Sequence, residues 1–256
     1  MSLTIPTFES GIIWGSTSEP QQSIYTQSET QKYTLGTLLV LPDGRKFRYA
    51  KNGAVALSKA YMTQSPAGVA NCLQEAQGTS GTAVEIGDQE IVVDVTSASG
   101  ITDNLYSEGW LVVNKSTGIG DIYKILACNL LTATTAKVLL ETPIRTAFAA
   151  ATELSLVKNK WCGVLVSTTT ATQTPTGVPL VDVTIGYYAW LQTCGPAPVY
   201  VDAGDTIVIG NNVGTPGTAG AAGTCGVQTA GTLPIWGQVM YVAAAADVGL
   251  IDLKLD

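Results

Sequence analysis

The spacing of apolar residues from position 33 onward constrains the fold more than any other feature of the sequence. Short apolar runs, often alternating with polar residues, are separated by clusters of Gly, Pro, Ser, Thr and Asn. Runs of this length are typical of strands, and turn residues at regular intervals are typical of antiparallel sandwiches and barrels. The sequence therefore predicts a mainly β protein. The expected strands cover 33–41, 45–50, 89–95, 109–114, 121–126, 136–140, 161–167, 177–184, 186–192, 198–201, 206–209, 235–243 and 249–255.

The clearest predicted turn is Pro42-Asp43-Gly44, because Pro fixes φ and Gly accepts the left-handed conformation of a tight hairpin. Two other segments are compatible with short helices. These are 69–77 and 142–152, the latter with Pro143 at a first helical position. The Gly-, Thr- and Ala-rich segment 210–231 is expected to be a long exposed loop, or a segment ordered only against a partner.

Charge changes sharply along the chain near residue 160. Residues 1–160 carry 14 acidic and 12 basic side chains, whereas residues 161–256 carry six acidic side chains and one base, Lys254. A composition shift of this kind indicates two structural units. We therefore expect a first β domain at 31–160 and a charge-poor β domain at 161–256, each a small antiparallel sandwich or barrel.

The first thirty residues lack periodicity and are rich in Ser, Thr, Gln and Glu. Such a segment buries too little apolar surface to fold alone, so it is either disordered or laid along another surface. Isolated apolar residues favour the second alternative. We expect residues 1–30 to form an extended N-terminal arm that crosses a neighbouring subunit or a larger assembly, with Ile12, Ile13 and Trp14 as its anchor.

The composition argues against most kinds of active site. The chain contains no histidine, which excludes Ser-His-Asp and Cys-His catalysis and metal sites that need imidazole, and its formal net charge is −7. A net-acidic chain without a dense basic run is a poor candidate for binding nucleic acid or an anionic membrane. Neither a secretory signal nor a membrane helix is expected. We predict no enzymatic activity, no cofactor and no metal.

Individual motifs are weak. The two carboxylates of Asp202-Ala203-Gly204-Asp205 resemble half of a calcium loop without its other ligands, so a plain turn is expected. Acidic residues at 85–94 are expected on a solvated strand edge rather than as paired catalytic carboxylates. The five cysteines are far apart and form no CxxC pair, which favours buried free thiols in a reducing compartment. They are Cys72, Cys128, Cys162, Cys194 and Cys225.

Tryptophans and basic residues each leave two interpretations open. The tryptophans at 14, 110, 161, 190 and 236 are expected to pack in cores, and the alternative is an aromatic platform for sugars. The basic cluster at 45–51 is expected to lie on a solvated strand face, and the alternative is an acidic docking partner. Its members are Arg45, Lys46, Arg48 and Lys51.

Several short strings together resemble a known class of viral protein. They are YTLGT at 33–37, PDGRKFRYAK at 42–51, GWLVV at 109–113, GIGDIYKI at 118–125, GYYAWLQ at 186–192, IWGQVM at 235–240 and GLIDLKL at 249–255. The chain from residue 32 onward resembles structural proteins of tailed bacteriophages of the capsid-decoration, or cement, type. The arm before residue 30 has no counterpart in this resemblance.

The resemblance implies a virion protein that binds the outer surface of the phage head, commonly as a homotrimer, and reinforces the shell against the pressure of internal DNA. It implies the major capsid protein and the chain itself as partners, synthesis in the host cytoplasm, and no catalysis. A phage tail or neck component is the alternative within the same class. Outside it, the tryptophans and carboxylates leave a carbohydrate-binding module or a β-fold glycan hydrolase open.

Overall fold

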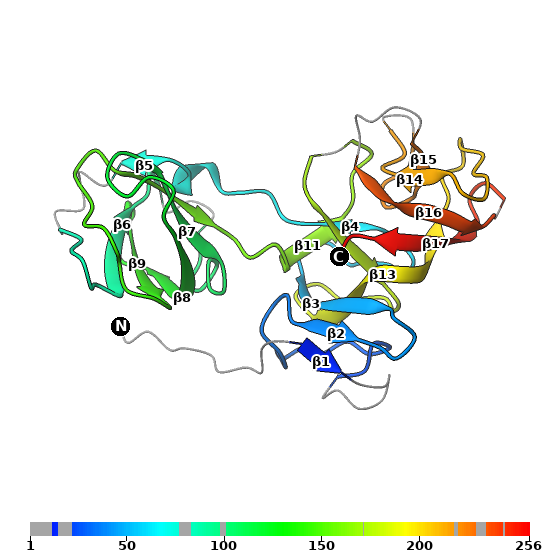
Figure 1. Ribbon diagram of the computed structural model, residues 1–256, viewed down its shortest axis with the longest axis horizontal. Coiled ribbons are helices and arrows are strands. Elements are labelled where there is room, and N and C mark those ends of the chain that lie inside the picture. Colours follow the sequence, from blue (N-terminus) through cyan, green and yellow to red (C-terminus); the bar gives the residue numbers. More distant parts are fainter. Residues whose placement is uncertain are drawn as a thin grey trace. The chain divides into compact units, whose positions relative to one another are not determined.

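The chain is mainly β, as the sequence predicts. The computed structural model describes residues 12–14, 22–76, 83–97, 101–170, 172–217, 220–228, 234–242 and 244–256. These residues combine a five-stranded barrel with a separate sheet (Figure 1). They contain no α-helix, and one 3₁₀ turn is formed by Ala70–Cys72.

Contacts divide the chain into two compact units, of which the first is the continuous segment 67–159. Its strands pair in the order β5-β10-β7-β8-β9-β6, and the longer ones curl around one core that contains Leu111, Tyr106 and Tyr123 (Figure 1). Side chains alternate between this core and solvent, as expected for antiparallel strands with one buried face. The strands are β5 (Glu75–Ala76), β6 (Glu90–Asp94), β7 (Trp110–Lys115), β8 (Ile122–Leu130), β9 (Thr135–Leu140) and β10 (Glu153–Val157).

In the described part of the chain, the second unit joins residues 12–14 and 22–66 to the segment from residue 160 onward. Its strands pair in the order β1-β2-β3-β11-β4-β12-β13-β17-β16-β14-β15, with a further pairing between β3 and β13. The strands are β1 (Ile12–Trp14), β2 (Leu38–Val40), β3 (Lys46–Asn52), β4 (Thr63–Gln64), β11 (Cys162–Val166), β12 (Pro175–Pro179), β13 (Tyr188–Tyr200), β14 (Asn212–Gly214), β15 (Gly226–Val227), β16 (Ile235–Tyr241) and β17 (Val248–Lys254).

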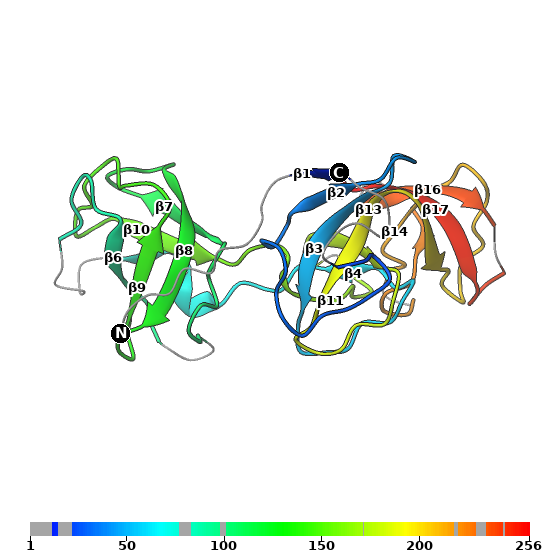
Figure 2. The same cartoon turned by 90° about the horizontal axis from the view of Figure 1, so that it is seen from below.

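The long strand β13 organises the second unit. Its first half pairs with β3 and its second half pairs with β17, as Figure 2 shows. A bulge between Gln192 and Cys194 separates the two halves, and a bulge bends a strand and increases its twist. One half therefore contributes Trp190 to a core with Tyr49, and the other contributes Val199 to a core with Trp236.

The predicted hairpin is confirmed. Gly44 has φ of +86°, its amide donates to the Leu41 carbonyl, and β2 and β3 pair antiparallel on either side of the turn. Asp43 accepts a hydrogen bond from the Arg45 amide at 3.1 Å, which closes an Asx-type turn.

The two units differ from the predicted domains at 31–160 and 161–256. Residues 22–66 pack with the chain after residue 160, because β3 pairs with β13 through contacts such as Tyr49 opposite Trp190. The first unit is thus an insertion between Pro66 and Lys160. The change in charge composition near residue 160 coincides with the junction at Lys160, but no such change accompanies the junction at Pro66.

Several local expectations also differ from the structure. Residues 142–152 form no helix because their amides bond to distant groups: Ile144 donates to the Asp88 carbonyl and Phe148 to the Val84 carbonyl. Segment 69–77 contains the 3₁₀ turn and β5 rather than a longer helix. The predicted strands 186–192 and 198–201 are parts of β13, the residues 206–209 are not a strand, and the predicted loop at 210–231 contains β14 and β15.

Candidate functional site

The predicted anchor of the N-terminal arm forms a short edge strand. Residues Ile12–Trp14 are β1, which pairs in parallel with β2 so that Ile12 lies opposite Leu38 and Trp14 opposite Val40. The structure therefore places the backbone of all three predicted anchor residues against the chain's own sheet. The contact with a neighbouring subunit or a shell stays a prediction. The other predicted arm residues, 1–11 and 15–21, lie outside the described residues.

The last part of the predicted arm belongs to the second unit. Gln22 is 5% exposed, and Ile24 is fully buried in the core that contains Trp190. Ser28 exchanges backbone hydrogen bonds with Tyr188 at the start of β13, at 2.9 and 2.8 Å. Residues 22–30 are therefore folded into the sheet, which moves the end of any free arm from residue 30 to before residue 22.

Gln22 is the polar centre of this attachment. Its side-chain amide donates to the carbonyls of Tyr188, at 2.8 Å, and Thr26, at 3.0 Å. Its side-chain oxygen accepts the buried hydroxyl of Tyr49 at 2.7 Å, and its backbone carbonyl accepts the indole N–H of Trp190 at 2.8 Å. Burial raises the pKa of Tyr49, so this hydroxyl stays protonated and donates. Gln22 thus connects the segment at 22–30 to the two strands β3 and β13.

An aromatic cluster surrounds these hydrogen bonds. The rings of Tyr33 and Tyr49 meet edge to face at 5.3 Å between centroids, and Trp190 lies 5.2 Å from Tyr33 and 5.1 Å from Tyr49. Tyr188 stacks on Tyr49 at 6.0 Å. Such pairs add stability beyond the area they bury. The attachment of residues 22–30 is therefore supported by packed aromatic rings.

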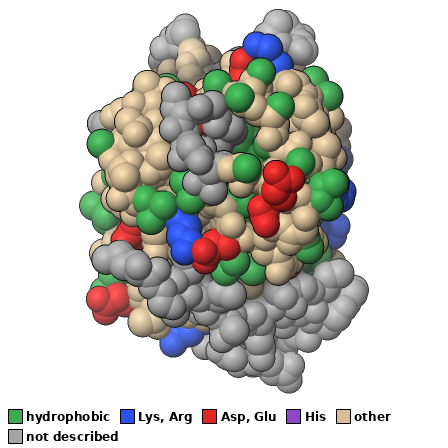
Figure 3. Space-filling model, turned by 90° about the vertical axis from the view of Figure 1, so that its left-hand side faces the viewer, with side chains coloured by type: hydrophobic (Ala, Val, Ile, Leu, Met, Phe, Trp, Pro, Cys, Tyr) green, Lys and Arg blue, Asp and Glu red, His purple; other side chains and the backbone are tan. Residues whose placement is uncertain are grey.

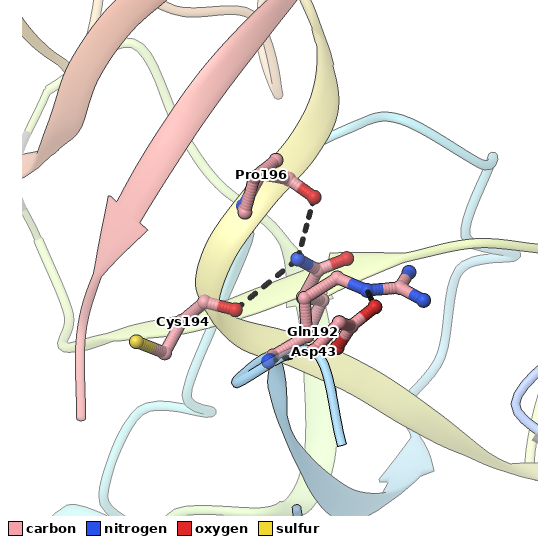
Figure 4. Close-up of polar contacts among 5 residues, drawn as sticks. Asp43, Gln192, Cys194 and Pro196 are labelled. Atoms are coloured by element: carbon pink, nitrogen blue, oxygen red, sulfur yellow. Dashed lines mark hydrogen bonds and ion pairs between the residues drawn. The ribbon is translucent and has the colours of Figure 1, made fainter. Parts of the chain in front are cut away.

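Intramolecular contacts occupy much of the basic cluster at 45–51. Arg48 forms a bidentate pair with Asp256, at 2.8 and 3.2 Å, and also donates to the Gly36 carbonyl. Arg45 pairs with Asp43 at 2.7 Å (Figure 4), and the Lys51 ammonium lies 5.5 Å from the Tyr188 ring centroid. These contacts favour a structural role for the cluster over the alternative of an acidic docking partner.

The bulge in β13 is fixed by a buried amide. Figure 4 shows the Gln192 side chain between the carbonyls of Cys194 and Pro196, to which its nitrogen donates at 3.2 and 2.8 Å. Gln192 is fully buried, and a side chain at the neighbouring Gly177 would approach the Gln192 carbonyl to 2.6 Å. These hydrogen bonds have a structural role, because they stabilise the bulge between the half of β13 that pairs with β3 and the half that pairs with β17.

Asp202 closes a loop through the hydrogen bonds that its carboxylate accepts. Its carboxylate accepts hydrogen bonds from the amides of Ala221 and Gly204, at 2.6 and 2.9 Å, and from the hydroxyl of Thr224 at 3.2 Å. Burial alone would raise the pKa of Asp202, but these donors lower it below its ordinary value. Burial and the Asp202 charge raise the pKa of the nearby Asp205. This arrangement supports the predicted turn over half of a calcium loop.

Two of the acidic residues at 85–94 make local contacts, whereas Asp94 is only 6% exposed and so does not lie on the predicted solvated edge. Glu90 forms an ion pair with Lys137 on the adjacent strand β9, and Asp88 accepts the Glu85 amide at 2.8 Å. Within the described ranges, no group of three or more His, Cys, Asp or Glu side chains is arranged to hold a metal ion.

Three of the tryptophans are buried and one is a surface residue. Trp190 and Trp236 are fully or almost fully buried and Trp161 is 9% exposed, whereas Trp110 on β7 is 40% exposed. The Lys124 ammonium lies 5.9 Å from the centroid of Trp110. The side chain of Trp14 lies outside the described residues. Core packing therefore describes three tryptophans, and Trp110 keeps the alternative of a binding platform open.

The thiols at 72, 128 and 225 are buried and free, and burial raises the pKa of both Cys128 and Cys225 to about 12. Cys162 and Cys194 are partly buried. A thiol with so high a pKa is a weak nucleophile at neutral pH. The described cysteines are thus arranged as packing residues.

Sequence analysis missed Gln22. It lies in the polar stretch SEPQQSIY, where nothing distinguishes it from its neighbour Gln21, and its importance comes only from partners far along the chain. No helix in the described part of the chain is long and apolar enough to cross a membrane. No protein-family model, no curated protein and no solved structure matches the chain.

Proposed function

We propose that the chain is a virion structural protein of a tailed bacteriophage, which binds the outer surface of the capsid and stabilises the shell as a decoration or cement protein. The sequence strings that resemble this class suggest it. The observation that carries it is the low charge of one part of the second unit, the segment after residue 160, whereas its other segment contains the basic cluster at 45–51. Between Trp161 and Ala246 the only charged residues are Asp182, Asp202 and Asp205, and Asp202 is buried.

A surface with so little charge suits a protein that is covered by neighbours. Uncharged surface is buried without the cost of removing ions from water, and interface cores are depleted in charge for this reason. Figure 3 faces the first unit, on which several Lys, Arg, Asp and Glu side chains are visible among hydrophobic side chains and other atoms. On a free monomer, low charge favours association.

In this proposal the N-terminal arm makes the contact with the shell. The arm is extended, ends before Gln22, and carries Ile12, Ile13 and Trp14 as the residues that meet the major capsid protein. The chain assembles as a homotrimer on the outer capsid surface after synthesis in the host cytoplasm. It acts by binding alone, without catalysis or cofactor. A place in the tail or neck is the alternative within this class.

The test is binding to tailed-phage heads assembled without this chain. Purified protein is mixed with heads and sedimented, and the heads are then heated to measure release of their DNA. We expect the protein to co-sediment at saturable stoichiometry and to raise the temperature of DNA release. A protein that stays in the supernatant at all concentrations, or that binds tails and leaves the heads unaffected, contradicts the proposal.

The exposed side chain of Trp110 favours a second candidate, glycan binding. Half-exposed Trp rings stack on sugar faces, and the nearby Lys124 supplies hydrogen-bond donors. Trp110 fluorescence that is quenched by a soluble oligosaccharide, and that loses this response in Trp110→Ala, would support this function. Unchanged emission over a panel of neutral and acidic oligosaccharides would exclude it.

A further inference from the structure

The short strand β1 joins the sheet through three residue pairs at its edge. It runs parallel to β2, from Ile12 opposite Leu38 to Trp14 opposite Val40. In the described part of the chain β1 pairs with no other strand, so it ends the strand order (Figure 1). A β2 edge without β1 would present unpaired amides and carbonyls, and such edges add strands from other chains. The structure thus shows both an edge that needs a strand and the segment that fits it.

The pairing registers show how far β1 lies from the attachment of the chain at Gln22. Trp14 is level with the first residue of β3, because both lie opposite Val40. Gln22 is bound near the other end of β3, since its side chain donates to Tyr188, which lies opposite Lys51. The steps from residue 46 to residue 51 cover about 17 Å, and three strand spacings from β1 to β13 add about 14 Å across the sheet. The two ends are therefore about 22 Å apart.

The sequence provides a short connection for this distance. Only residues 15–21 lie between Trp14 and Gln22. A connection of this length reaches at most about 28 Å when fully extended. A flexible linker of the same length averages about 15 Å between its ends. Pairing of β1 with β2 of the same chain therefore requires a separation well above that average.

A short connection under tension favours exchange of the segment that it carries. When β1 pairs with β2 of a neighbouring copy, the distance to be covered is set by how the copies pack and not by the sheet of one chain. Exchange keeps every backbone pair between β1 and β2, because each copy carries both the strand and the edge that accepts it. A second copy of this chain is therefore the partner that the register favours.

We propose that β1 is exchanged between subunits, so that Ile12–Trp14 of one copy pairs with β2 of the next copy. This inference rests on the proposed function for its biological setting and adds the element that joins the subunits. In the trimer each copy donates one strand and accepts one, which closes a ring. The second backbone edge of β1 then remains for the major capsid protein.

Disulfide cross-linking of the full chain tests the exchange without any capsid. Ile12→Cys/Leu38→Cys places two thiols at directly opposite positions, at a Cα separation that a disulfide can span. After mild oxidation with diamide, we expect a covalent trimer on a denaturing, non-reducing gel, because each bond joins two copies. The matched control is Val112→Cys/Ile122→Cys, whose positions lie opposite each other on β7 and β8, and which should remain a covalent monomer. Oxidised wild type accounts for the native cysteines.

The second test changes only the connection. Inserting about eight Gly and Ser residues after Ser18 relieves the tension and favours pairing within one chain. We expect sedimentation equilibrium over about 0.1 to 100 µM to show self-association weakened about tenfold or more. The same insertion after Ala230 is the matched control and should leave self-association unchanged. This measurement still decides the question if Ile12→Cys/Leu38→Cys does not fold.

Three results overturn the inference: a wild type that is monomeric throughout the concentration range, a covalent monomer from Ile12→Cys/Leu38→Cys in the assembled protein, and equal self-association of the two insertion variants. A covalent dimer would support strand exchange and contradict the trimer. Strand exchange in a protein that does not bind phage heads would refute the proposed function and leave this inference standing.

Discussion

At the scale of single residues, Gln22 determines where the polar N-terminal sequence becomes part of a folded unit. Its side chain satisfies the Tyr49 hydroxyl and the Tyr188 carbonyl beside a hydrophobic core of aromatic and aliphatic side chains. A buried polar group without a partner costs more than an ordinary hydrogen bond contributes. The position therefore tolerates few side chains, although it lies in a stretch of otherwise unremarkable polar sequence.

Replacing Gln22 should destabilise the second unit. Gln22→Ala leaves the buried hydroxyl of Tyr49 without its acceptor, so we expect the free energy of unfolding to fall by about 2 to 3 kcal/mol. Denaturant unfolding followed by tryptophan fluorescence measures it. Glu29→Ala is the control in the same segment, since Glu29 is exposed, and its effect should stay within about 0.5 kcal/mol. Equal effects of the two substitutions would show that the network at Gln22 does not stabilise the fold.

Asp202 should make stability depend on pH in a definite direction. Its folded pKa lies below the ordinary value of 3.8, so its contribution is present above that value and is lost as pH falls through the folded pKa. We expect Asp202→Asn to lower the free energy of unfolding at pH 7 by about 1 to 3 kcal/mol, because buried amide donors lose a charged acceptor. The difference from wild type should shrink below pH 4, which unfolding curves at several pH values measure.

Asp205 supplies the control of opposite sign. Its pKa is raised, so its favourable contribution is present at low pH and is lost as pH rises through the folded pKa. Asp205→Asn should therefore increase the free energy of unfolding at pH 7 and leave it unchanged at pH 3. A loss of stability at pH 7 in this variant would contradict the assigned environment of the carboxylate.

At the scale of elements, the sequence predicted those features that depend on neighbouring residues alone. Pro42-Asp43-Gly44 specified its turn, and alternation in β9 specified which side chains lie inside. Elements set by distant partners were not predictable in this way. Gly195 and Pro196 indicated a break between two strands, but pairing with β17 keeps them inside the single strand β13. The sequence of segment 142–152 is compatible with a helix, but its amides donate to carbonyl groups elsewhere in the unit, so no helix forms.

The residues of the candidate site likewise fall into a part that the sequence predicted and a part that it did not. Ile12, Ile13 and Trp14 stood out because apolar residues are rare in a polar segment, and they form the edge strand β1. The attachment at 22–30 had no such signal, since it depends on hydrogen bonds to β13 across more than half of the sequence. Nor could the sequence show which apolar residues stay exposed, because exposed and buried apolar residues cannot be distinguished before the pairing of the strands is known.

Two truncations should separate the arm from the fold. Removal of residues 1–20 takes away the short edge strand β1 but leaves Gln22 and Ile24 in place, so the second unit should still unfold cooperatively, with only a small loss in the free energy of unfolding. Binding to phage heads should weaken about tenfold or more, equivalent to about 1.4 kcal/mol. Head binding at full strength would show that the arm is dispensable.

Removal of residues 1–30 should have a different effect. It also removes the fully buried Ile24 and the carbonyl that accepts the Trp190 indole N–H, so we expect a loss of about 3 kcal/mol or more in the free energy of unfolding. The comparison uses the same denaturant curves as for the shorter truncation. Two truncated proteins of equal stability would contradict the attachment of residues 22–30.

At the scale of the whole molecule, one unit is inserted into the other, and each has its own core. The ends of the insertion leave the second unit near each other: Gln64 of β4 lies opposite Leu165 of β11, and Pro66 adjoins Gly163. Insertions with both ends close together are well tolerated, because the host fold can form around them.

Each unit should therefore fold without the other. Residues 67–159 alone should unfold cooperatively, with Trp110 as the only fluorescent tryptophan and with slow thiol labelling at Cys72 and Cys128, which are buried. The remaining chain, with a short Gly-Ser linker in place of 67–159, should keep the near-ultraviolet circular dichroism of its aromatic cluster. Rapid labelling of both thiols in the fragment would show that its core needs the other unit.

The same topology sets the order in which the protein matures on the ribosome. The strand β3 is synthesised early, but its partner β13 emerges only after the whole inserted unit, which at ordinary translation rates takes about 10 s or more. The inserted unit can fold during this interval, while the edge of β3 that later pairs with β13 remains unpaired. Lys46, Arg48 and Lys51 lie along that strand, and charged side chains discourage unpaired edges from joining other chains. We therefore expect these basic residues to hinder aggregation of the nascent chain before Arg48 and Lys51 make their contacts in the finished fold.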